Sequence, residues 1–277
     1  MTGPLTSALT APLTGPLCGE AVLAYDADSE AWLDLVAAAG GTVTGAHRAI
    51  ASARFVAEKA AGRWGTVLKR LYLPIWGVAA ANAIDLVTRA SGTWIGGVTH
   101  AAGWVQSNGT TGYFQTPENQ NVLWASPNSN GLFFGSYEVN TISGLSGYVG
   151  HRDGAGNGVQ LWHVDDANLA YDSAHHTFRA GVATPKQAGI FIASRVGTGV
   201  HFGRRMGGSY TALANVTTAT GGTLPALPVY ALRNHGFYSN DKRAFFGIVE
   251  GANAAACEAI TATLETLWEG LTGLTLP

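Results

Sequence analysis

The densest group of chemically versatile side chains lies between residues 151 and 176 and combines histidines with charged groups. Its members are His151, Arg152, Asp153, His163, Asp165, Asp166, Asp172, His175 and His176. Imidazoles and carboxylates together can bind a divalent metal, but this spacing matches no helix-borne zinc motif. Two interpretations stay open: a loop site for calcium at Asp165 and Asp166, or ordinary polar residues along one edge of a β-sandwich. No other cofactor is expected.

Aromatic residues beside Asn, Asp and Gly indicate a second kind of chemistry. Their rings have apolar faces that can stack on the C–H surface of a sugar. The predicted glycan-binding residues are Trp162, Tyr171 and Tyr148, and Trp124 and Tyr210 have similar surroundings. The competing interpretation is that most of these rings belong to a core between two sheets.

The sequence contains no recognisable catalytic motif. It has neither a Gly-x-Ser-x-Gly nucleophile elbow nor a Gly-x4-Gly-Lys-Ser/Thr phosphate loop. Cleavage of a glycosidic bond needs two carboxylates about 5 to 9 Å apart, whereas Glu138 stands alone in the segment 137–140. The sequence therefore predicts no catalytic residues and no enzymatic activity. A glycan-cleaving jelly-roll enzyme is the least favoured alternative.

The first element that must position these side chains is an N-terminal arm. Residues 3–18 repeat a four-residue unit, which three prolines interrupt. Proline restricts the residue before it to extended geometry, so residues 1–20 are predicted to form an extended arm. Its four leucines, Leu5, Leu9, Leu13 and Leu17, are the predicted assembly contacts with a neighbouring molecule. The alternative is a flexible tail.

Helical periodicity dominates residues 21–76. A first helix is expected to begin at a cap on Asp28 or Ser29 and to stop at Gly40, and a second to begin at Thr44. A third short helix is predicted over residues 64–73, because the apolar spacing continues up to a proline.

A last helix is expected near the C-terminus, within residues 252–277. Its apolar stripe consists of Ile260, Leu264, Leu267 and Leu271, and three glutamates, Glu258, Glu265 and Glu269, are expected to face away from the protein. Gly270 is the predicted end of this helix.

Between about residues 77 and 251 the apolar period changes to two. Short segments rich in aromatic and β-branched residues alternate with turn signals such as Asn108-Gly109 and Asn157-Gly158, which suit hairpins. No helix-length periodic segment separates them, which disfavours a parallel α/β sheet. The predicted fold class is mainly β: an antiparallel jelly-roll or concanavalin-like β-sandwich (77–251), preceded by the arm (1–20) and a helical segment (21–76) and followed by a C-terminal helix and tail (252–277).

Charge and composition restrict the partners. Sixteen Lys and Arg against 18 Asp and Glu give a net charge of −2, which provides no field for binding nucleic acid. The longest apolar stretch, residues 71–84, is shorter than the roughly 18 residues of a membrane span, and the N-terminus lacks the basic region of a signal peptide. We therefore expect neither nucleic-acid binding, nor membrane insertion, nor a secretion signal.

Two features of the composition leave questions open. Residues 74–151 carry only four charges, at Asp85, Arg89, Glu118 and Glu138. Either Thr, Asn, Gln and Ser hydrate this surface, or it forms an interface with a protein or a sugar, since interface cores are depleted in charge. The two cysteines, Cys18 and Cys257, lie near opposite ends, and the sequence does not decide whether they pair.

Several short segments together form a family pattern. They are the Leu-Thr repeat up to Leu17, Asp26-Ala-Asp28 before the helices, Asn82-Ala-Ile-Asp-Leu86, Asn108-Gly-Thr-Thr-Gly-Tyr113, and residues 238–248 before the last helix. In these segments the chain resembles tailed-bacteriophage virion proteins that carry a concanavalin-like (laminin-G-like) lectin sandwich behind an N-terminal helical segment. The resemblance implies a structural or adhesive virion component, and it supplies no catalytic residues.

The resemblance leads to an expected function. The chain would be a bacteriophage virion structural protein on the particle exterior, located in a tail fibre or tail tip and displaying its sandwich for host attachment. A capsid decoration protein (cement or head fibre) is the alternative, and a secreted lectin is a third hypothesis. The expected partners are other virion proteins, further copies of this chain in a large assembly, and a host surface glycan. Synthesis would take place in the host cytoplasm, without a signal peptide.

Overall fold

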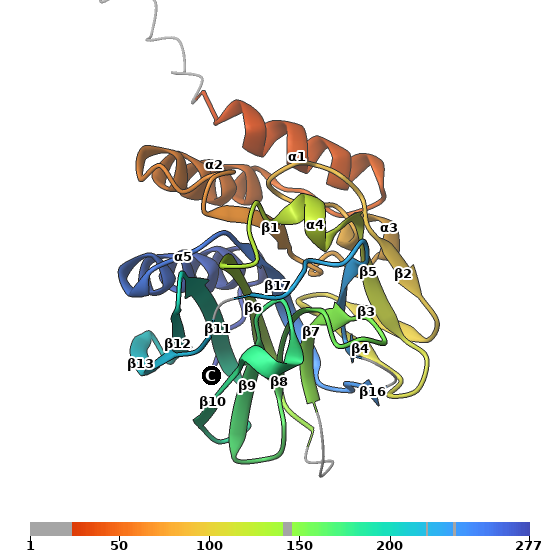
Figure 1. Ribbon diagram of the computed structural model, residues 1–277. Coiled ribbons are helices and arrows are strands. Elements are labelled where there is room, and N and C mark those ends of the chain that lie inside the picture. The colour runs from red at the N-terminus through yellow and green to blue at the C-terminus, as the bar shows by residue number, and fades with distance from the viewer. Residues whose placement is uncertain (1–23, 141–145, 220, 235–236) are drawn as a thin grey trace, which may run out of the picture.

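Short segments rich in aromatic and β-branched residues form two antiparallel sheets that pack face to face (Figure 1). In the computed structural model the described residues are 24–140, 146–219, 221–234 and 237–277. The predicted mainly β fold, an antiparallel β-sandwich with helices at its N-terminal side and a C-terminal helix, is confirmed. The predicted arm with its four leucines, and Cys18, lie outside the described residues.

One sheet has eight strands. Its order is β13 (Ser209–Thr217), β12 (Gly199–Met206), β11 (Gly189–Val196), β6 (Ser129–Glu138), β17 (Lys242–Val249), β4 (Trp104–Ser107) and β3 (Val98–Ala101), with β1 (Leu68–Tyr72) also paired to β17. The strands β6, β17 and β11, which come from distant parts of the sequence, form its centre.

The other sheet has seven strands. Its order is β10 (Arg179–Ala183), β9 (Asn168–Asp172), β8 (Gly158–His163), β7 (Ser146–Arg152), β14 (Pro228–Ala231), β5 (Tyr113–Asn119) and β2 (Thr93–Ile95). A separate two-stranded hairpin, β15 (Arg233–Asn234) with β16 (Phe237–Tyr238), lies next to β7. The turn that contains Asn157 joins β7 to β8 as the predicted hairpin.

Alternation along the central strands creates two apolar layers. On β6, Leu132 and Phe134 face the seven-stranded sheet, whereas Phe133 faces the helices. All three side chains are fully buried. A strand that is covered on both faces reads as a continuous apolar run, which explains why β6, β11 and β17 lack polar alternation.

Three long helices cover the outer face of the eight-stranded sheet. They are α1 (Ala27–Ala38), α2 (Gly45–Ala60) and α5 (Ala254–Thr272), while α3 (Ala79–Asn82), α4 (Gln120–Leu123) and the 3-10 turn η1 (His176–Phe178) are single turns. The predicted Thr44 cap starts α2, but α1 is capped by Asp26, whose carboxylate accepts hydrogen bonds from the backbone of Asp28 (3.0 Å) and Ser29 (3.1 Å).

Part of the predicted third helix is a strand. Residues 68–72 form β1, which pairs antiparallel with β17. Trp64 packs on Phe55 of α2, with ring centroids 4.2 Å apart. Leu68 and Leu71 carry a spacing that also suits a helix, but pairing with β17 satisfies their backbone groups and buries both side chains.

The C-terminal helix confirms its predicted apolar stripe and corrects two details. All four stripe residues are buried. The helix ends at Gly273, which takes the left-handed conformation with φ 68°, and not at Gly270. Glu265 does not face outward: it is 5 % exposed and binds Arg205 at 2.5 Å. Helix α5 is therefore connected to β12 by charge as well as by apolar packing.

The turn at Asn108 joins two sheets and not the two strands of one hairpin. Strand β4 before it belongs to the eight-stranded sheet and β5 after it to the seven-stranded sheet. The Asn108 amide oxygen accepts hydrogen bonds from the backbone N–H groups of Thr110, Thr111 and Gly112 at 2.9 to 3.1 Å. This side chain stabilises a turn that the dipeptide pattern alone cannot distinguish from a hairpin.

The four charges of residues 74–151 are all paired. Asp85 and Glu118 contact Arg70 at 3.6 and 2.7 Å. Arg89 binds Asp28 at 2.7 Å, and Glu138 binds Lys242 at 2.5 Å. Three of these four charges thus connect the 74–151 segment to the helical segment or to β1. In the part of the chain that the structure describes, we find no helix with the length and apolar character of a membrane span.

Candidate functional site

The outer face of the seven-stranded sheet is the surface that no long helix covers in the described part of the chain (Figure 1). Phe114, Leu161 and Tyr171 point into the core between the sheets. Because side chains alternate along a strand, the residues on either side of them point outward. This face therefore displays Tyr113 and Trp162, and the side chains around them are half-buried aromatic and polar groups.

Three tyrosines surround one arginine on this face, and we call Tyr113, Tyr230, Tyr238 and Arg233 the tyrosine–arginine cluster. The guanidinium carbon of Arg233 lies 4.6, 5.4 and 5.5 Å from the ring centroids of Tyr113, Tyr230 and Tyr238. The rings of Tyr113 and Tyr230 are 5.1 Å apart. All four side chains are partly exposed, so the cluster has rings and a cation at the protein surface.

Separate strands bring the cluster together. Tyr113 begins β5, and Tyr230 lies in β14, which pairs with β5 so that Tyr230 is opposite Gln115. Leu232 has a positive φ of 68° and its side chain is buried, which turns the chain from β14 into β15. Arg233 and Tyr238 then face each other across the β15–β16 hairpin.

The electrostatics of the cluster favour donation of hydrogen bonds from Arg233. No described residue forms a hydrogen bond or ion pair with its guanidinium, and its Nε is buried without a partner. Partial burial raises the pKa of Tyr230, so its phenol stays neutral and can also donate. The ring of His151 stacks beside Tyr230, with centroids 4.3 Å apart, and extends the aromatic surface toward β7.

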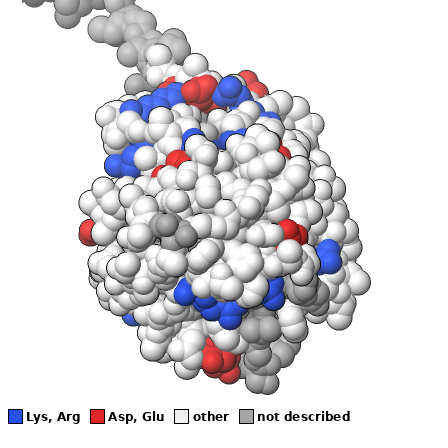
Figure 2. Space-filling view, viewed as in Figure 1, with Lys and Arg blue, Asp and Glu red and all other residues white. Residues whose placement is uncertain are grey.

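A second group, Trp162 with Arg179, Asp172 and Gln160, lies on the same face toward β10. The Arg179 guanidinium covers the Trp162 ring at 4.8 Å from its centroid and binds Asp172 at 2.9 Å. Gln160 also donates a hydrogen bond to Asp172. Trp162 is 4 % exposed, so a sugar could reach its ring only if Arg179 moved. Figure 2 shows a group of Lys and Arg side chains in the lower half of the view, with a group of Asp and Glu side chains below it.

The other predicted aromatic residues are placed differently. Tyr171 is fully buried between the sheets and donates its hydroxyl to Asn130; burial also raises its pKa strongly. It belongs to the core, and its ring has no face open to a sugar. Trp124 is also core, since its indole N–H donates to the Val249 carbonyl at 2.8 Å. Tyr148 lies in β7, and its side chain is outside the described residues. The Tyr210 hydroxyl contacts His201 Nε2 at 2.6 Å.

The histidine and carboxylate group is dispersed by the fold. His163 points into the core against Phe191, with ring centroids 4.9 Å apart, whereas Asp165 lies exposed in the following turn. Asp165 accepts hydrogen bonds from the Ala167 backbone (2.8 Å) and the Asn168 amide (2.9 Å), which lower its pKa. Among the described residues, no three His, Cys, Asp or Glu side chains come together as a metal site would require. Calcium binding at Asp165 and Asp166 stays a prediction.

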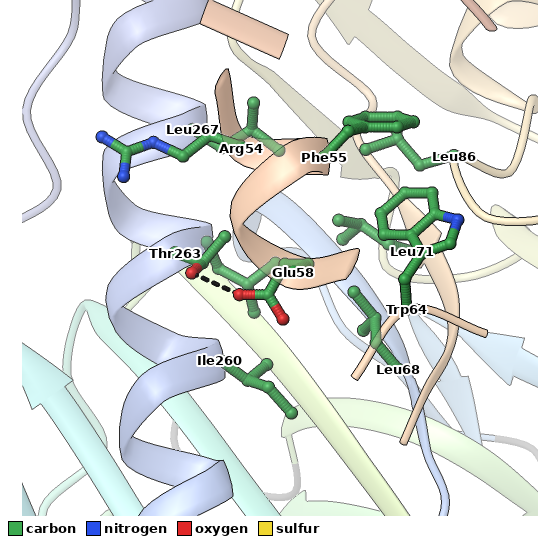
Figure 3. Close-up of a pocket in the computed structure, with 11 residues that line it drawn as sticks. Arg54, Phe55, Glu58, Trp64, Leu68, Leu71, Leu86, Ile260, Thr263 and Leu267 are labelled. Atoms are coloured by element: carbon green, nitrogen blue, oxygen red, sulfur yellow. Dashed lines mark hydrogen bonds between the residues drawn. The ribbon is translucent and has the colours of Figure 1, made fainter. Parts of the chain in front are cut away.

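Two hollows elsewhere are less suited to a polar ligand. The first, between α2, β1 and α5, has a volume of about 10 Å³, about the space of one water molecule. Phe55, Trp64 and Leu71 point into it from three elements, and its polar edge is closed by a hydrogen bond from Thr263 to Glu58 (Figure 3). It is a packing defect of the helical layer.

The second hollow is a groove of about 310 Å³ between the helices and the β3–β4 hairpin. Apolar groups dominate its lining, and its histidine, His47, already accepts a hydrogen bond from the Thr44 backbone at the start of α2. The Thr272 hydroxyl donates to the Trp268 carbonyl. These polar groups have structural partners, so the groove is a weaker candidate for a polar ligand than the tyrosine–arginine cluster.

Comparison with known proteins supports the fold alone. Neither a protein-family model nor a curated protein sequence matches the chain. Among solved structures, a Trypanosoma rangeli sialidase in complex with the inhibitor DANA aligns with 87 % of this chain and 37 % of its own, at 12 % identity and a TM-score of 0.51. A mutant of that sialidase displaying trans-sialidase activity aligns with 79 % and 39 %, at 11 % identity and a TM-score of 0.50. A Ruminococcus gnavus sialidase CBM40 bound to α2,3-sialyllactose aligns with 48 % and 82 %, at 8 % identity and a TM-score of 0.37.

These comparisons correct one expectation. The sequence predicted no enzymatic activity, but two of the solved structures that this fold resembles are sialidases, which are glycan-cleaving enzymes. The prediction that the chain is not an enzyme is therefore overturned. The chain spans only 37 to 39 % of the length of those sialidases, and at identities of 11 to 12 % the likeness concerns the fold alone and transfers no activity.

Proposed function

We propose that the chain is a lectin-like, glycan-binding module whose site is the tyrosine–arginine cluster. The observation that carries this proposal is the presence of three partly exposed tyrosine rings around a guanidinium that no described residue pairs with, beside a sheet face that no described long helix covers. Ring faces can stack on sugar C–H groups, while the guanidinium and phenol groups donate hydrogen bonds to sugar oxygens. The cluster rests on paired strands, which keeps its geometry rigid before binding.

The test is binding of the whole protein to an oligosaccharide array, followed by titration of each sugar that binds. Tyr230→Ala and Tyr113→Ala should each weaken binding about tenfold or more, since each removes a stacking surface at the centre of the site. Tyr25→Ala is the matched control, because Tyr25 is partly exposed and lies just before α1, a helix that lies at the opposite end of the molecule from β16 (Figure 1). Absence of binding to any sugar, or an equal loss in the control, would contradict the proposal.

We propose, second, that this module belongs to a bacteriophage virion protein on the particle exterior. The support comes from the sequence: the Leu-Thr repeat with Leu5, Leu9, Leu13 and Leu17, and the resemblance of the chain to phage proteins that carry a lectin sandwich. A tail-fibre, tail-tip or host-adhesion role is the first choice, and capsid decoration is the alternative. The partners would be other virion proteins and further copies of this chain.

Deletion of residues 1–19 tests the assembly role. The truncated protein should keep its folded sandwich and its sugar binding but should no longer join particles, because the leucine contacts are lost. Full incorporation of the truncated protein would contradict the anchoring role. Competition of purified protein with particles for host cells distinguishes the two positions, since only an adhesin should block attachment.

A further inference from the structure

No described residue offers an oxygen partner to Arg233, unlike five other arginines of the protein. Arg70 binds Glu118, Arg179 binds Asp172, Arg205 binds Glu265, Arg243 binds Asp241, and Arg195 donates to the carbonyls of Gly197 and Ala219. Arg233 is half-buried, and no described residue accepts a hydrogen bond from it. A partly desolvated cation without an anionic partner is energetically unfavourable, and such unpaired groups mark sites where a partner binds.

The three rings surround the guanidinium without using its hydrogen-bond donors. They contact the cation through their π faces, at 4.6 to 5.5 Å from ring centroid to guanidinium carbon. Cation–π contacts stabilise the positive charge but leave the N–H donors unused. The fork of N–H groups is thereby held in place and matches the two oxygens of a carboxylate or a sulfate.

The partly exposed tyrosine rings provide a stacking surface beside this fork, and no acidic side chain of the described residues forms an ion pair with Arg233. A ligand that fills the site would therefore present an apolar ring face to the aromatic groups and a negative group to Arg233.

We infer that the cluster selects acidic sugars, in which an anionic substituent binds Arg233 while the sugar ring stacks on the tyrosines. This inference rests on the proposed function and defines the class of glycan that the same site recognises. The shared chemistry is an anionic oxygen pair on a sugar, either a uronic or sialic carboxylate or a sulfate ester.

The experiment uses an array that holds neutral, uronate-containing, sialylated and sulfated oligosaccharides, with the full chain and two variants. We expect acidic members to bind and their neutral parents to bind at least tenfold more weakly. Arg233→Gln should weaken acidic ligands about tenfold to a hundredfold, the loss expected for a charge-assisted hydrogen bond, and should weaken neutral ligands less, because glutamine can still donate a hydrogen bond to a sugar hydroxyl. Arg233→Lys keeps the charge but loses the fork, so it should weaken binding less than Arg233→Gln does.

Three results separate the two proposals. Preferential binding of neutral sugars, with no effect of Arg233→Gln but a loss in Tyr230→Ala, would overturn the acidic selectivity and keep the glycan-binding function. Binding of acidic sugars that disappears in Arg233→Gln, while thermal unfolding of the variant is unchanged, would support both, and the uronate and sulfate members would show which anion is preferred. No binding to any member would overturn both.

Discussion

The two outer faces of the sandwich differ in what covers them. On the eight-stranded sheet, outward residues such as Phe133 and Ile192 are apolar and lie beneath α2 and α5. On the seven-stranded sheet, the outward residues include Tyr113 and Tyr230, which remain partly exposed beside Arg233 of the β15–β16 hairpin. The helices of this chain therefore cover one sheet, whereas the other sheet keeps aromatic and charged side chains at its surface.

The largest expected loss of stability follows from a substitution on the face that the helices cover. Trp32 of α1 is fully buried and packs against Phe55 and Trp76, with ring centroids 6.2 and 5.7 Å apart. Trp32→Ala should lower the free energy of unfolding by about 3 to 5 kcal/mol, because it leaves a large cavity. Tyr230→Ala on the open face should lower it by about 1 kcal/mol or less. Urea unfolding of both variants measures the difference, and equal losses would show that the two faces are not distinct.

A smaller effect is expected at the buried ion pair of the helical layer. Glu58 is 1 % exposed; its two carboxylate oxygens accept hydrogen bonds from Arg63 at 2.8 Å each and from Thr263 at 2.6 Å. Glu58→Gln should destabilise the protein by about 3 kcal/mol, since it leaves the Arg63 charge uncompensated.

The control for Glu58 is an ion pair at the surface. Asp34, whose side chain is 67 % exposed, contacts Arg48 at 2.8 Å. Asp34→Asn should change the free energy of unfolding by about 0 to 1 kcal/mol, and added salt should reduce even that effect. Equal losses of unfolding free energy in the two variants would show that burial does not strengthen the contribution of the Glu58 pair.

The smallest effect concerns pH and the inner face of β8. Burial, with repulsion from Arg243, lowers the pKa of His163 to about 3 from an ordinary value of 6.5. The unfolded chain therefore binds a proton that the folded chain excludes. The contribution of neutral His163 to the free energy of unfolding is fully present above pH 6.5 and is lost as the pH falls toward 3. Each unit by which the pH falls in this window lowers the free energy of unfolding by up to about 1.4 kcal/mol.

Urea unfolding between pH 6.5 and 5 measures this loss for the native protein and for His163→Gln. The variant cannot take up the proton, so its stability should depend less on pH over this interval. The pKa of His100 is also lowered by burial, and its contribution is common to both proteins. Parallel pH profiles would show that His163 does not cause the acid sensitivity.

Much of the fold could be predicted because its signals are local. Thr44 caps α2 through its own side chain, and the stripe from Ile260 to Leu271 lies on one face of α5. These patterns depend on residues within one or two turns. The strand β1 was missed because its partner, β17, lies about 170 residues further along the chain, and pairing over that separation has no local signal.

The sequence predicted the type of residue at the candidate site but not which residues form it. Aromatic residues on a sandwich face were expected, and Trp162 does lie on the outer face, although Arg179 covers it. Tyr171 has the same local composition but points inward, because the strand alternation places it in the core. The cluster around Arg233 was missed: Tyr113 and Tyr230 lie more than 100 residues apart, and the one local hint was the alternation of each with a buried neighbour.

The sequence by itself determined the mainly β class, the helices at both ends and the low charge, because turn residues, apolar periods and composition act through neighbouring residues or through simple counts. Only the tertiary structure decided which sheet face the helices cover, that four charges of the 74–151 segment are paired, and that Arg233 lies among three tyrosines with no ion-pair partner among the described residues. These outcomes depend on contacts between distant strands, whose register follows from burial of the whole core and cannot be read from any single segment.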